Sequence, residues 1–226
     1  LNAKKDTTGA GGAGIYVNGQ ITDENNAPVI SLTNTKICDV DNASQGMYLA
    51  GYATTTLTNC DITGVTGVEI RAGKLTVSGG AITGTATPVT VTPNENGSTT
   101  AGAGVALAQH TTKLPVIVTI ENATVKGYTG VYESNPQNND SASIEKVNLT
   151  ISGGNFEAIN NGTNAVYSED CTNFISGGTF SSDVSAYAGS NAVASLKNVY
   201  YVGTDSIEAA VNSMSGGDTL TVIKGS

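Results

Sequence analysis

The amino-acid sequence predicts an all-β protein, and within that class a right-handed parallel β-helix of about six to seven coils, with three short strands per coil. Three observations support this prediction: the composition, a seven-residue pattern that recurs along the chain, and a strand-like pattern that recurs with it. Of the 226 residues, 28 are glycine and 13% are charged. Helical bundles are rich in Ala, Glu, Lys and Leu, whereas short Val, Ile and Thr runs between Gly and Asn are typical of strands.

The seven-residue pattern aligns without gaps in SLTNTKI (31–37), TLTNCDI (56–62), TVSGGAI (76–82), TIENATV (119–125), TISGGNF (150–156) and FISGGTF (174–180). Its fourth position is only Asn or Gly, which tolerate a left-handed backbone. A bend there turns the apolar second and seventh positions toward one interior. We therefore predict two inward ladders, which comprise Leu32, Leu57, Val77, Ile120, Ile151 and Ile175, and Ile37, Ile62, Ile82, Val125, Phe156 and Phe180.

The strand-like pattern occurs in GIYV (14–17), GMYL (46–49), GVEI (67–70), GVAL (104–107), GVYE (130–133) and AVYS (165–168). Side chains alternate between the two faces of a strand, so the second position should point inward and the third outward. The third positions form a line of Tyr16, Tyr48, Glu69, Ala106, Tyr132 and Tyr167. An exposed Tyr offers an apolar ring and a hydroxyl to a sugar or a protein. The four tyrosines are the candidate ligand-binding residues, in two pairs; the alternative is a purely structural aromatic stack.

The chain divides into three parts by pattern. Residues 1–11 are expected to be a flexible N-terminal segment, and 12–197 the β-helix repeat domain. Residues 198–226 read as a strand (199–203), a capping box (205–208) opening a helix through about Met214, and a strand (218–223); they form a cap or begin a further module. Insertions at 84–103, 108–115 and 134–147 are either tolerated loops or the place where function resides.

Charge and cysteine content exclude several function classes. The net charge of −9 and the pI near 4.4 disfavour nucleic-acid binding and anionic membrane surfaces, and no apolar run is long enough to predict membrane insertion in this segment. Of the three cysteines, Cys60 should point inward and Cys38 outward, which opposes a disulfide between them. No CxxC spacing suggests a metal, and no cofactor is predicted.

Few residues suggest catalysis. The GxGxxG match at 9–14 lacks the strand and helix that a dinucleotide site requires. The only arginine, Arg71, is expected to be a surface ion-pair partner close to Glu69. A glycosidase needs two nearby acids; Asp39, Asp41, Asp61 and Glu69 qualify by density, but the alignment places Asp61 beside Lys36, which indicates a cross-strand ion pair. The only histidine, His110, has no obvious Ser or Cys partner. No catalytic residue is predicted.

The repeats resemble those of the pectin-lyase-like fold and the Gly/Asn/Thr-rich repeats of bacterial surface proteins, over roughly residues 12–190. SIEAAV…GGDTLTV near the C-terminus resembles the segment that opens many such β-helices. The resemblance implies a secreted or cell-surface bacterial protein. We expect a non-catalytic module for adhesion, glycan contact or spacing, with a glycan or a cell-surface protein as partner. The alternatives are a carbohydrate-active enzyme, such as a polysaccharide lyase or glycoside hydrolase, and a phage tail-spike fragment.

Overall fold

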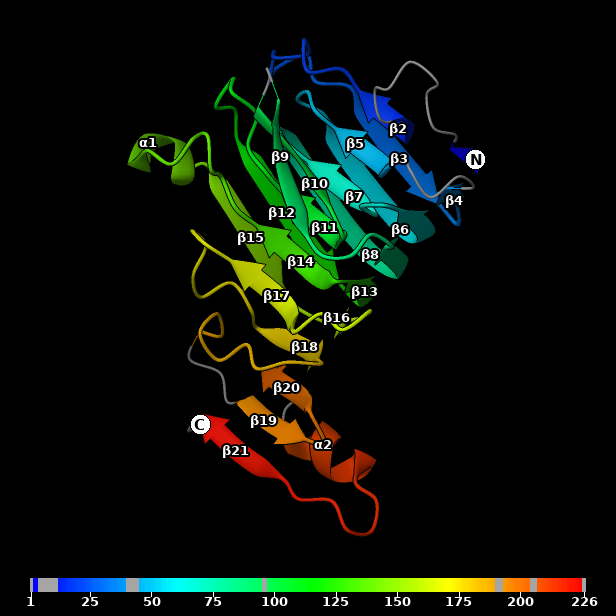
Figure 1. The fold of residues 1–226 in the computed structure, drawn as a ribbon, viewed down its shortest axis with the longest axis vertical. Coiled ribbons are helices and arrows are strands. Elements are labelled where there is room, and N and C mark those ends of the chain that lie inside the picture. The colour runs from blue at the N-terminus through cyan, green and yellow to red at the C-terminus, as the bar shows by residue number, and fades with distance from the viewer. Residues whose placement is uncertain are drawn as a thin grey trace.

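The computed structural model describes residues 2–3, 12–39, 45–94, 97–189, 193–203 and 207–224. These residues are mostly strands, with two short helices, α1 (Ser141–Ile144) and α2 (Ile207–Ser213). The strands form a 13-stranded sheet, a six-stranded sheet and a separate two-stranded hairpin (Figure 1). Most neighbouring strands in the two larger sheets run parallel, which confirms the predicted all-β class.

The six-stranded sheet is built from the strand-like pattern. Its strands, all paired in parallel, are β2 (Ala13–Val17), β5 (Gln45–Leu49), β7 (Val68–Ile70), β11 (Ala103–Leu107), β14 (Thr129–Glu133) and β17 (Asn164–Ser168). Equivalent positions lie opposite one another: Met47 faces both Ile15 and Val68, and Val131 faces both Val105 and Val166. The register predicted from the sequence is therefore confirmed for this sheet.

The seven-residue pattern builds the larger sheet. Its parallel strands are β1 (Asn2–Ala3), β3 (Val29–Thr33), β4 (Lys36–Asp39), β6 (Thr54–Gly64), β8 (Gly73–Gly84), β12 (Val116–Glu121), β13 (Ala123–Gly127), β15 (Val147–Ile151), β16 (Gly154–Ala158) and β18 (Gly177–Phe180). Leu57 lies opposite Leu32 and Val77, and Val125 opposite Ile82 and Phe156. Both predicted ladders are thus in register along the sheet.

The bends occur where Asn holds the fourth position. Asn34, Asn59 and Asn122 have φ of 49°, 50° and 52°, as predicted. Among the glycines the outcome is mixed: Gly79 and the following Gly80 have φ of 73° and 78°, but the repeats at 150–156 and 174–180 have the positive φ one residue after the fourth position, at Gly154 and Gly178. The prediction was wrong there because a Gly-Gly pair lets either residue adopt the left-handed conformation.

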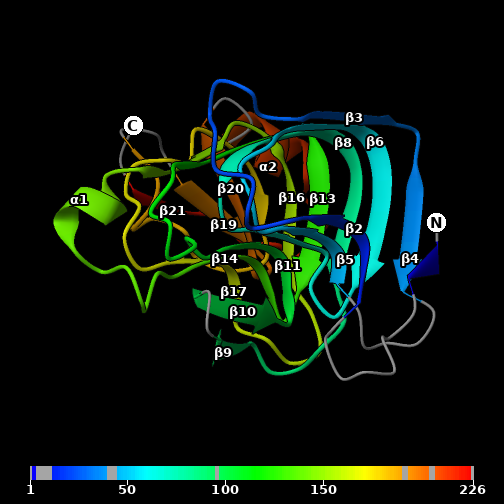
Figure 2. The same cartoon turned by 90° about the horizontal axis from the view of Figure 1, so that it is seen from above.

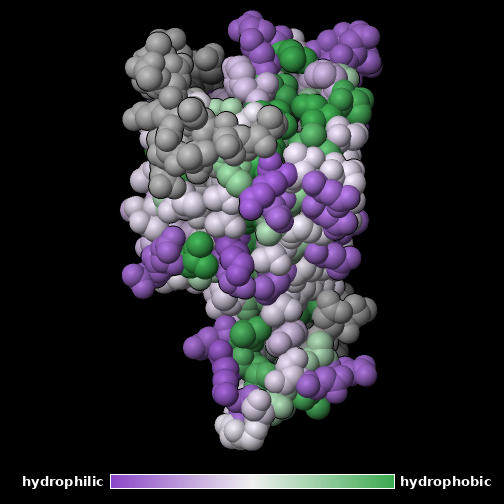
Figure 3. All heavy atoms as spheres, turned by 90° about the vertical axis from the view of Figure 1, so that its right-hand side faces the viewer, coloured by the Kyte–Doolittle hydropathy of each residue, from purple (hydrophilic) through white to green (hydrophobic). Residues whose placement is uncertain are grey.

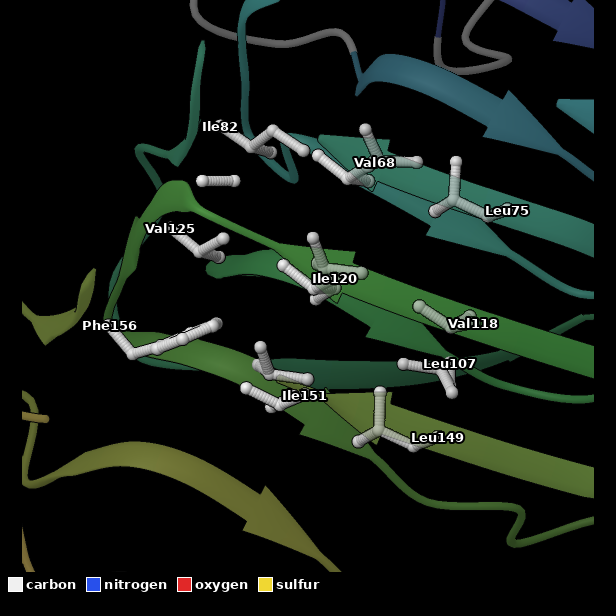
Figure 4. Packing of buried hydrophobic residues seen from close by; sticks show 14 of the residues in the cluster. Val68, Leu75, Ile82, Leu107, Val118, Ile120, Val125, Leu149, Ile151 and Phe156 are labelled. Atoms are coloured by element: carbon white, nitrogen blue, oxygen red, sulfur yellow. The ribbon is translucent and has the colours of Figure 1, made fainter. Parts of the chain in front are cut away.

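The hydrophobic core lies between the two sheets (Figures 2 and 4). Ladder residues such as Leu57, Ile82 and Ile151 are at most 1% exposed, whereas Leu32, near one end, is only partly buried. Phe156 and Phe180 stack with ring centroids 4.9 Å apart. Each fully buried aliphatic side chain contributes roughly 1.5–3 kcal/mol relative to exposure, so these ladders supply the main stabilisation.

Strand pairing changes from parallel to antiparallel at the C-terminal end. There, β20 (Val199–Gly203) pairs with β18 and β19 (Val193–Leu196), and β19 pairs with β21 (Thr221–Lys224). The strand predicted at 199–203 is confirmed. Helix α2 ends at Ser213, one residue before the predicted end, and the last strand covers 221–224 rather than 218–223.

Some predicted features lie partly or wholly outside the described residues. Positions 205 and 206 of the capping box fall there, as do Asp41 and most of the 1–11 segment, including residues 9–11 of the GxGxxG match. Of the N-terminal segment only Asn2–Ala3 is described, as strand β1 paired with β4.

Exposed apolar side chains are found toward the two ends of the molecule. Tyr16 and Val29 belong to the N-terminal strands; Ile207, Val211, Val222 and Ile223 belong to the C-terminal helix and strand. The face in Figure 3 shows apolar surface mainly toward its upper and lower ends. Neither described helix has the length and hydropathy needed to cross a bilayer.

Candidate functional site

The predicted tyrosine line exists on the outer face of the six-stranded sheet. Tyr16 lies opposite Tyr48, and Tyr132 opposite Tyr167, while Glu69 and Ala106 occupy the two positions between the pairs. The rings of Tyr16 and Tyr48 stack with centroids 5.7 Å apart, and those of Tyr132 and Tyr167 at 5.2 Å. The division into two pairs is therefore as predicted.

Stacking decides what each pair offers to a ligand. Tyr16 is 58% exposed and the other three tyrosines are half-buried. Because the rings of a pair lie within 18° of parallel, their inner faces cover each other. The ring edges and outer faces are what remains for contact. A ligand would meet two narrow aromatic ridges rather than a flat platform.

The gap between the pairs is filled by the 84–103 insertion. Within it, β9 (Thr90–Asn94) and β10 (Gly97–Ala101) pair only with each other and lie against the six-stranded sheet (Figures 1 and 2). The Thr100 amide donates a hydrogen bond to Glu69 Oε2 at 3.1 Å, and the Thr66 hydroxyl donates to the Thr100 carbonyl. Glu69 and Ala106 are both 0% exposed beneath this hairpin.

Arg71 is not the surface residue that the sequence predicted. Its side chain is 0% exposed, and its guanidinium donates a hydrogen bond to the Tyr48 hydroxyl, with Cζ 5.8 Å from the ring centroid. A Cβ added to Gly97 of β10 would lie 1.8 Å from Arg71 Nη2. The prediction was wrong because the pattern around β7 indicates only which face of the sheet Arg71 is on. It does not indicate whether an insertion elsewhere in the chain covers that face.

The buried Glu69 carboxyl is electrostatically unusual. Burial raises its pKa to about 8, although the Thr100 amide, the Arg71 charge and the Gln45 side chain each act to lower it. Gln45 donates to the same oxygen, Oε2, whereas Oε1 has no hydrogen-bond partner among the described residues. Burial and the contacts of the carboxyl therefore act on its pKa in opposite directions, and burial has the larger effect.

His110 belongs to the same region. It is buried, its Nδ1 accepts a hydrogen bond from the Thr112 amide at 3.2 Å, and its own amide donates to the Arg71 carbonyl. Burial, followed by the nearby Arg71 charge, lowers its pKa. A neutral imidazole with Nδ1 as acceptor positions the 108–115 loop.

A second buried carboxylate, Glu133, was missed by the sequence analysis. Its Oε2 accepts hydrogen bonds from the Ser168 hydroxyl at 2.7 Å and from the Asp170 and Glu169 amides at 2.9 and 3.1 Å. Its Oε1 accepts from the Asn135 side chain. Burial raises the Glu133 pKa, while the Ser168 hydroxyl and the loop amides oppose the rise. The overlooked signal is an acid at a pattern position that is Val, Leu or Ile in four of the other five segments.

The 108–115 and 134–147 insertions pack against each other. Asn138 donates to the carbonyls of Gln109 and His110 at 3.1 and 2.7 Å, and the Gln109 amide donates to Asn135 Oδ1 at 2.8 Å. At the surface, Lys113 Nζ lies 2.7 Å from Asp140 Oδ2. The two insertions are thus fastened to each other, and Asn135 also donates a hydrogen bond to Glu133 at the end of β14.

The remaining predicted candidates do not assemble into a site within the described residues. Lys36 lies directly opposite Asp61, as the alignment predicted. Cys38, Cys60 and Cys171 are all free thiols, so the predicted absence of a Cys38–Cys60 bridge is confirmed, and Cys60 is buried as expected. No cluster of three or more His, Cys, Asp or Glu in the described ranges is arranged to hold a metal.

A groove of about 420 Å³ lies on the other sheet, where β20 meets β18. The groove is lined by Tyr201, Thr179, Asn155 and Glu157, among others. Thr179 lies opposite Tyr201 on one neighbouring strand and opposite Asn155 on the other. The Asn155 side chain donates a hydrogen bond to Glu157 Oε1 at 2.6 Å, and Lys126 forms an ion pair with Glu157 at 2.8 Å. Tyr201 therefore provides a half-buried tyrosine remote from the tyrosine line.

The comparisons with known proteins give no relative. No protein-family model matches the chain, and no match was found among curated proteins or solved structures.

Proposed function

We propose that the chain is a non-catalytic module of a secreted or cell-surface bacterial protein, with a right-handed parallel β-helix fold, whose six-stranded sheet contacts glycans. The in-register ladders and the left-handed bends support the β-helix, since one strand of the smaller sheet and two strand segments of the larger one recur in each repeat. The tyrosine line carries the functional part of the proposal.

The contact surface is best developed around Tyr132 and Tyr167. Beside this pair, Ser134 donates to Oε2 of the exposed Glu169 at 2.6 Å. Aromatic edges next to hydroxyl and carboxylate groups can pack against a sugar ring and accept hydrogen bonds from its hydroxyls. The acidic surface, with a net charge of −9, favours neutral over acidic sugars.

Buried hydrogen bonds fasten the loops that border this face. Glu69 holds the β9–β10 hairpin and Glu133 holds the loop at 168–171. A surface held in this way loses little conformational entropy when a ligand binds. The buried carboxylates therefore serve to position loops in the proposed function.

A glycan array probed with the wild-type chain tests the proposal, followed by titrations with Tyr167→Ala and Tyr16→Ala. Each substitution should weaken binding about two- to twelvefold, the range that corresponds to 0.5–1.5 kcal/mol for an aromatic contact. Tyr201→Ala, a tyrosine on the other sheet, is the matched control and should bind normally. Binding that is unaffected by both substitutions on the six-stranded sheet would contradict the proposed surface.

A carbohydrate-active enzyme is the alternative, and one observation favours it. Strongly shifted pKa values are common among catalytic acids, and the Glu69 pKa is raised to about 8 beside Arg71. Incubation with polysaccharides and measurement of released reducing ends tests this function. Product formed by the wild type and lost in Glu69→Gln would support the enzyme.

A further inference from the structure

Two Asn-Gly dipeptides lie within the described residues, at 18–19 and 161–162, and the asparagine of a third, at 96–97, lies outside them. In such a dipeptide the glycine amide nitrogen can attack the amide carbon of the preceding side chain, because glycine has no Cβ that obstructs the approach. Asn18 and Asn161 are both exposed. Access to solvent therefore does not distinguish the two sites, and the difference between them lies in their hydrogen bonds.

Asn18 opens a turn directly after β2. Its main-chain carbonyl accepts a hydrogen bond from the Ile21 amide at 3.0 Å, and its side-chain Oδ1 accepts one from the Gln20 amide at 2.9 Å. The second bond holds the Asn18 side chain over its own turn. Among the described residues, the Gly19 amide that lies between these two donors has no hydrogen-bond partner. The attacking nitrogen is thus free, while the group that it would attack is held beside it.

The second dipeptide is constrained in a different way. The Gly162 amide donates a hydrogen bond to the Ile159 carbonyl at 2.9 Å, and Asn161 has φ of 67°. Gly162 is also packed against the main chain, since a Cβ added to it would lie 1.8 Å from the Tyr128 carbonyl oxygen. The Gly162 hydrogen bond must break before its nitrogen can attack the Asn161 side chain, so the fold protects this asparagine.

We propose that Asn18 is a site of spontaneous covalent modification, at which the folded protein deamidates, and that Asn161 is protected from the same reaction. The proposal does not depend on glycan contact. It rests on three features of the 18–21 turn: an exposed asparagine before glycine, a glycine amide without a partner among the described residues, and a side-chain carbonyl that accepts the Gln20 amide.

The reaction needs only water and hydroxide. Hydroxide removes the Gly19 amide proton, and the nitrogen forms a bond to Asn18 Cγ while negative charge develops on Oδ1. The Gln20 N–H already donates to Oδ1, so it stabilises this charge as the donors of an oxyanion hole do. The bond between Cγ and Nδ2 then breaks, and Nδ2 takes a proton from water and leaves as ammonia. The product is a five-membered succinimide ring.

Water opens the succinimide at one of its two carbonyls. Opening at Cγ gives aspartate, whose carboxylate can still accept the Gln20 hydrogen bond. Opening at the main-chain carbonyl gives isoaspartate, in which the chain runs through Cβ and Cγ. This displaces a carbonyl that accepts the Ile21 amide and lies so close to Gly51 that a Cβ there would be 2.0 Å from its oxygen. The isoaspartate form should therefore be the less stable, and both forms place a new negative charge two residues after Tyr16.

Incubation of the wild-type chain at pH 7 and pH 9, followed by proteolytic digestion and mass spectrometry, measures the replacement of NH2 by OH at each asparagine. Asn18 should deamidate about two- to twelvefold faster than Asn161, the ratio expected for one hydrogen bond that must first break, and both rates should be higher at pH 9. In urea, where the chain is unfolded, the two rates should be equal. An Asn18 that reacts no faster than Asn161, or the same ratio in urea, would overturn the proposal.

Two variants test the roles of the neighbouring residues. Gly19→Ala hinders the attacking nitrogen and should lower the Asn18 rate to that of Asn161 or below; a wild-type rate in this variant would contradict the reaction. Its Cβ would lie 3.1 Å from His110 Nε2, so circular dichroism should accompany it, and the comparison within the wild type decides if it does not fold. Gln20→Ala keeps the main-chain donor to Oδ1 and, as the matched control, should react as the wild type does. The isoaspartate form, separated by ion exchange, should melt below Asn18→Asp.

Discussion

Oδ1 of Asn59 occupies the space directly over Gly79, so that a Cβ atom added to Gly79 would lie 2.3 Å from it. The same arrangement recurs at Asn122 and Gly153, where the distance is 2.9 Å. Glycine at these two fourth positions therefore leaves space beside an Asn side chain of the preceding repeat. Gly79 has the left-handed backbone as well, with φ of 73°.

Asn59→Val should destabilise the protein by roughly 1–2 kcal/mol, because Asn59 has φ of 50° and a β-branched residue is strained there. Asn59→Gly, which accepts this backbone, should be nearly neutral. Urea unfolding followed by circular dichroism measures both. Equal destabilisation by the two substitutions would show that the Asn side chain, and not its backbone conformation, is required.

Gly79→Ala should also destabilise, since Gly79 has φ of 73° and its added Cβ would clash with Asn59. In the Asn59→Gly background the clash is absent and only the backbone strain remains. A double-mutant cycle should therefore give a favourable coupling of roughly 0.5–3 kcal/mol. Strictly additive effects would mean that the Asn59 side chain moves aside at little cost.

Tyr48→Ala should lower the unfolding free energy more than Tyr16→Ala. Tyr16 is largely exposed, and its loss removes one stacking partner, which is worth roughly 0.5–1.5 kcal/mol. Tyr48 also accepts a hydrogen bond from the buried Arg71, so its removal should cost about 1–3 kcal/mol more. Tyr48→Phe isolates the hydroxyl. A larger loss in Tyr16→Ala than in Tyr48→Ala would contradict the Arg71 contact.

Glu133→Ala should cost about 3 kcal/mol or more, because it leaves the Ser168 hydroxyl and the amides of Glu169 and Asp170 without their acceptor. Thermal unfolding of this variant beside Glu169→Ala, an exposed carboxylate on the same loop, is the measurement. The Glu169 variant should lose less than about 1 kcal/mol. Similar melting temperatures for the two variants would refute a structural role for Glu133.

The repeat register could be read from the sequence with little ambiguity. Apolar residues at the second and seventh positions, with Asn or Gly between them, satisfy burial and backbone geometry in only one arrangement. Ile37 facing Ile62, and Val125 facing Phe156, follow from that periodicity. The outward tyrosines follow from the same alternation, because each apolar neighbour commits the next side chain to the other face.

Tertiary structure determined what surrounds the centre of the tyrosine line, at Glu69 and Ala106. The 84–103 insertion has no counterpart in the other repeats, so periodicity carries no information about where it packs. Its placement over β7 buries Glu69 and Arg71, which the sequence placed at the surface, and raises the Glu69 pKa. Glu133 likewise acquires its role from the amides of Glu169 and Asp170, more than thirty residues away. The local sequence pattern determined which face of the sheet each strand residue points to. Contacts between distant segments determined which of the outward positions are covered, because the burial of a side chain depends on every segment that packs against its face.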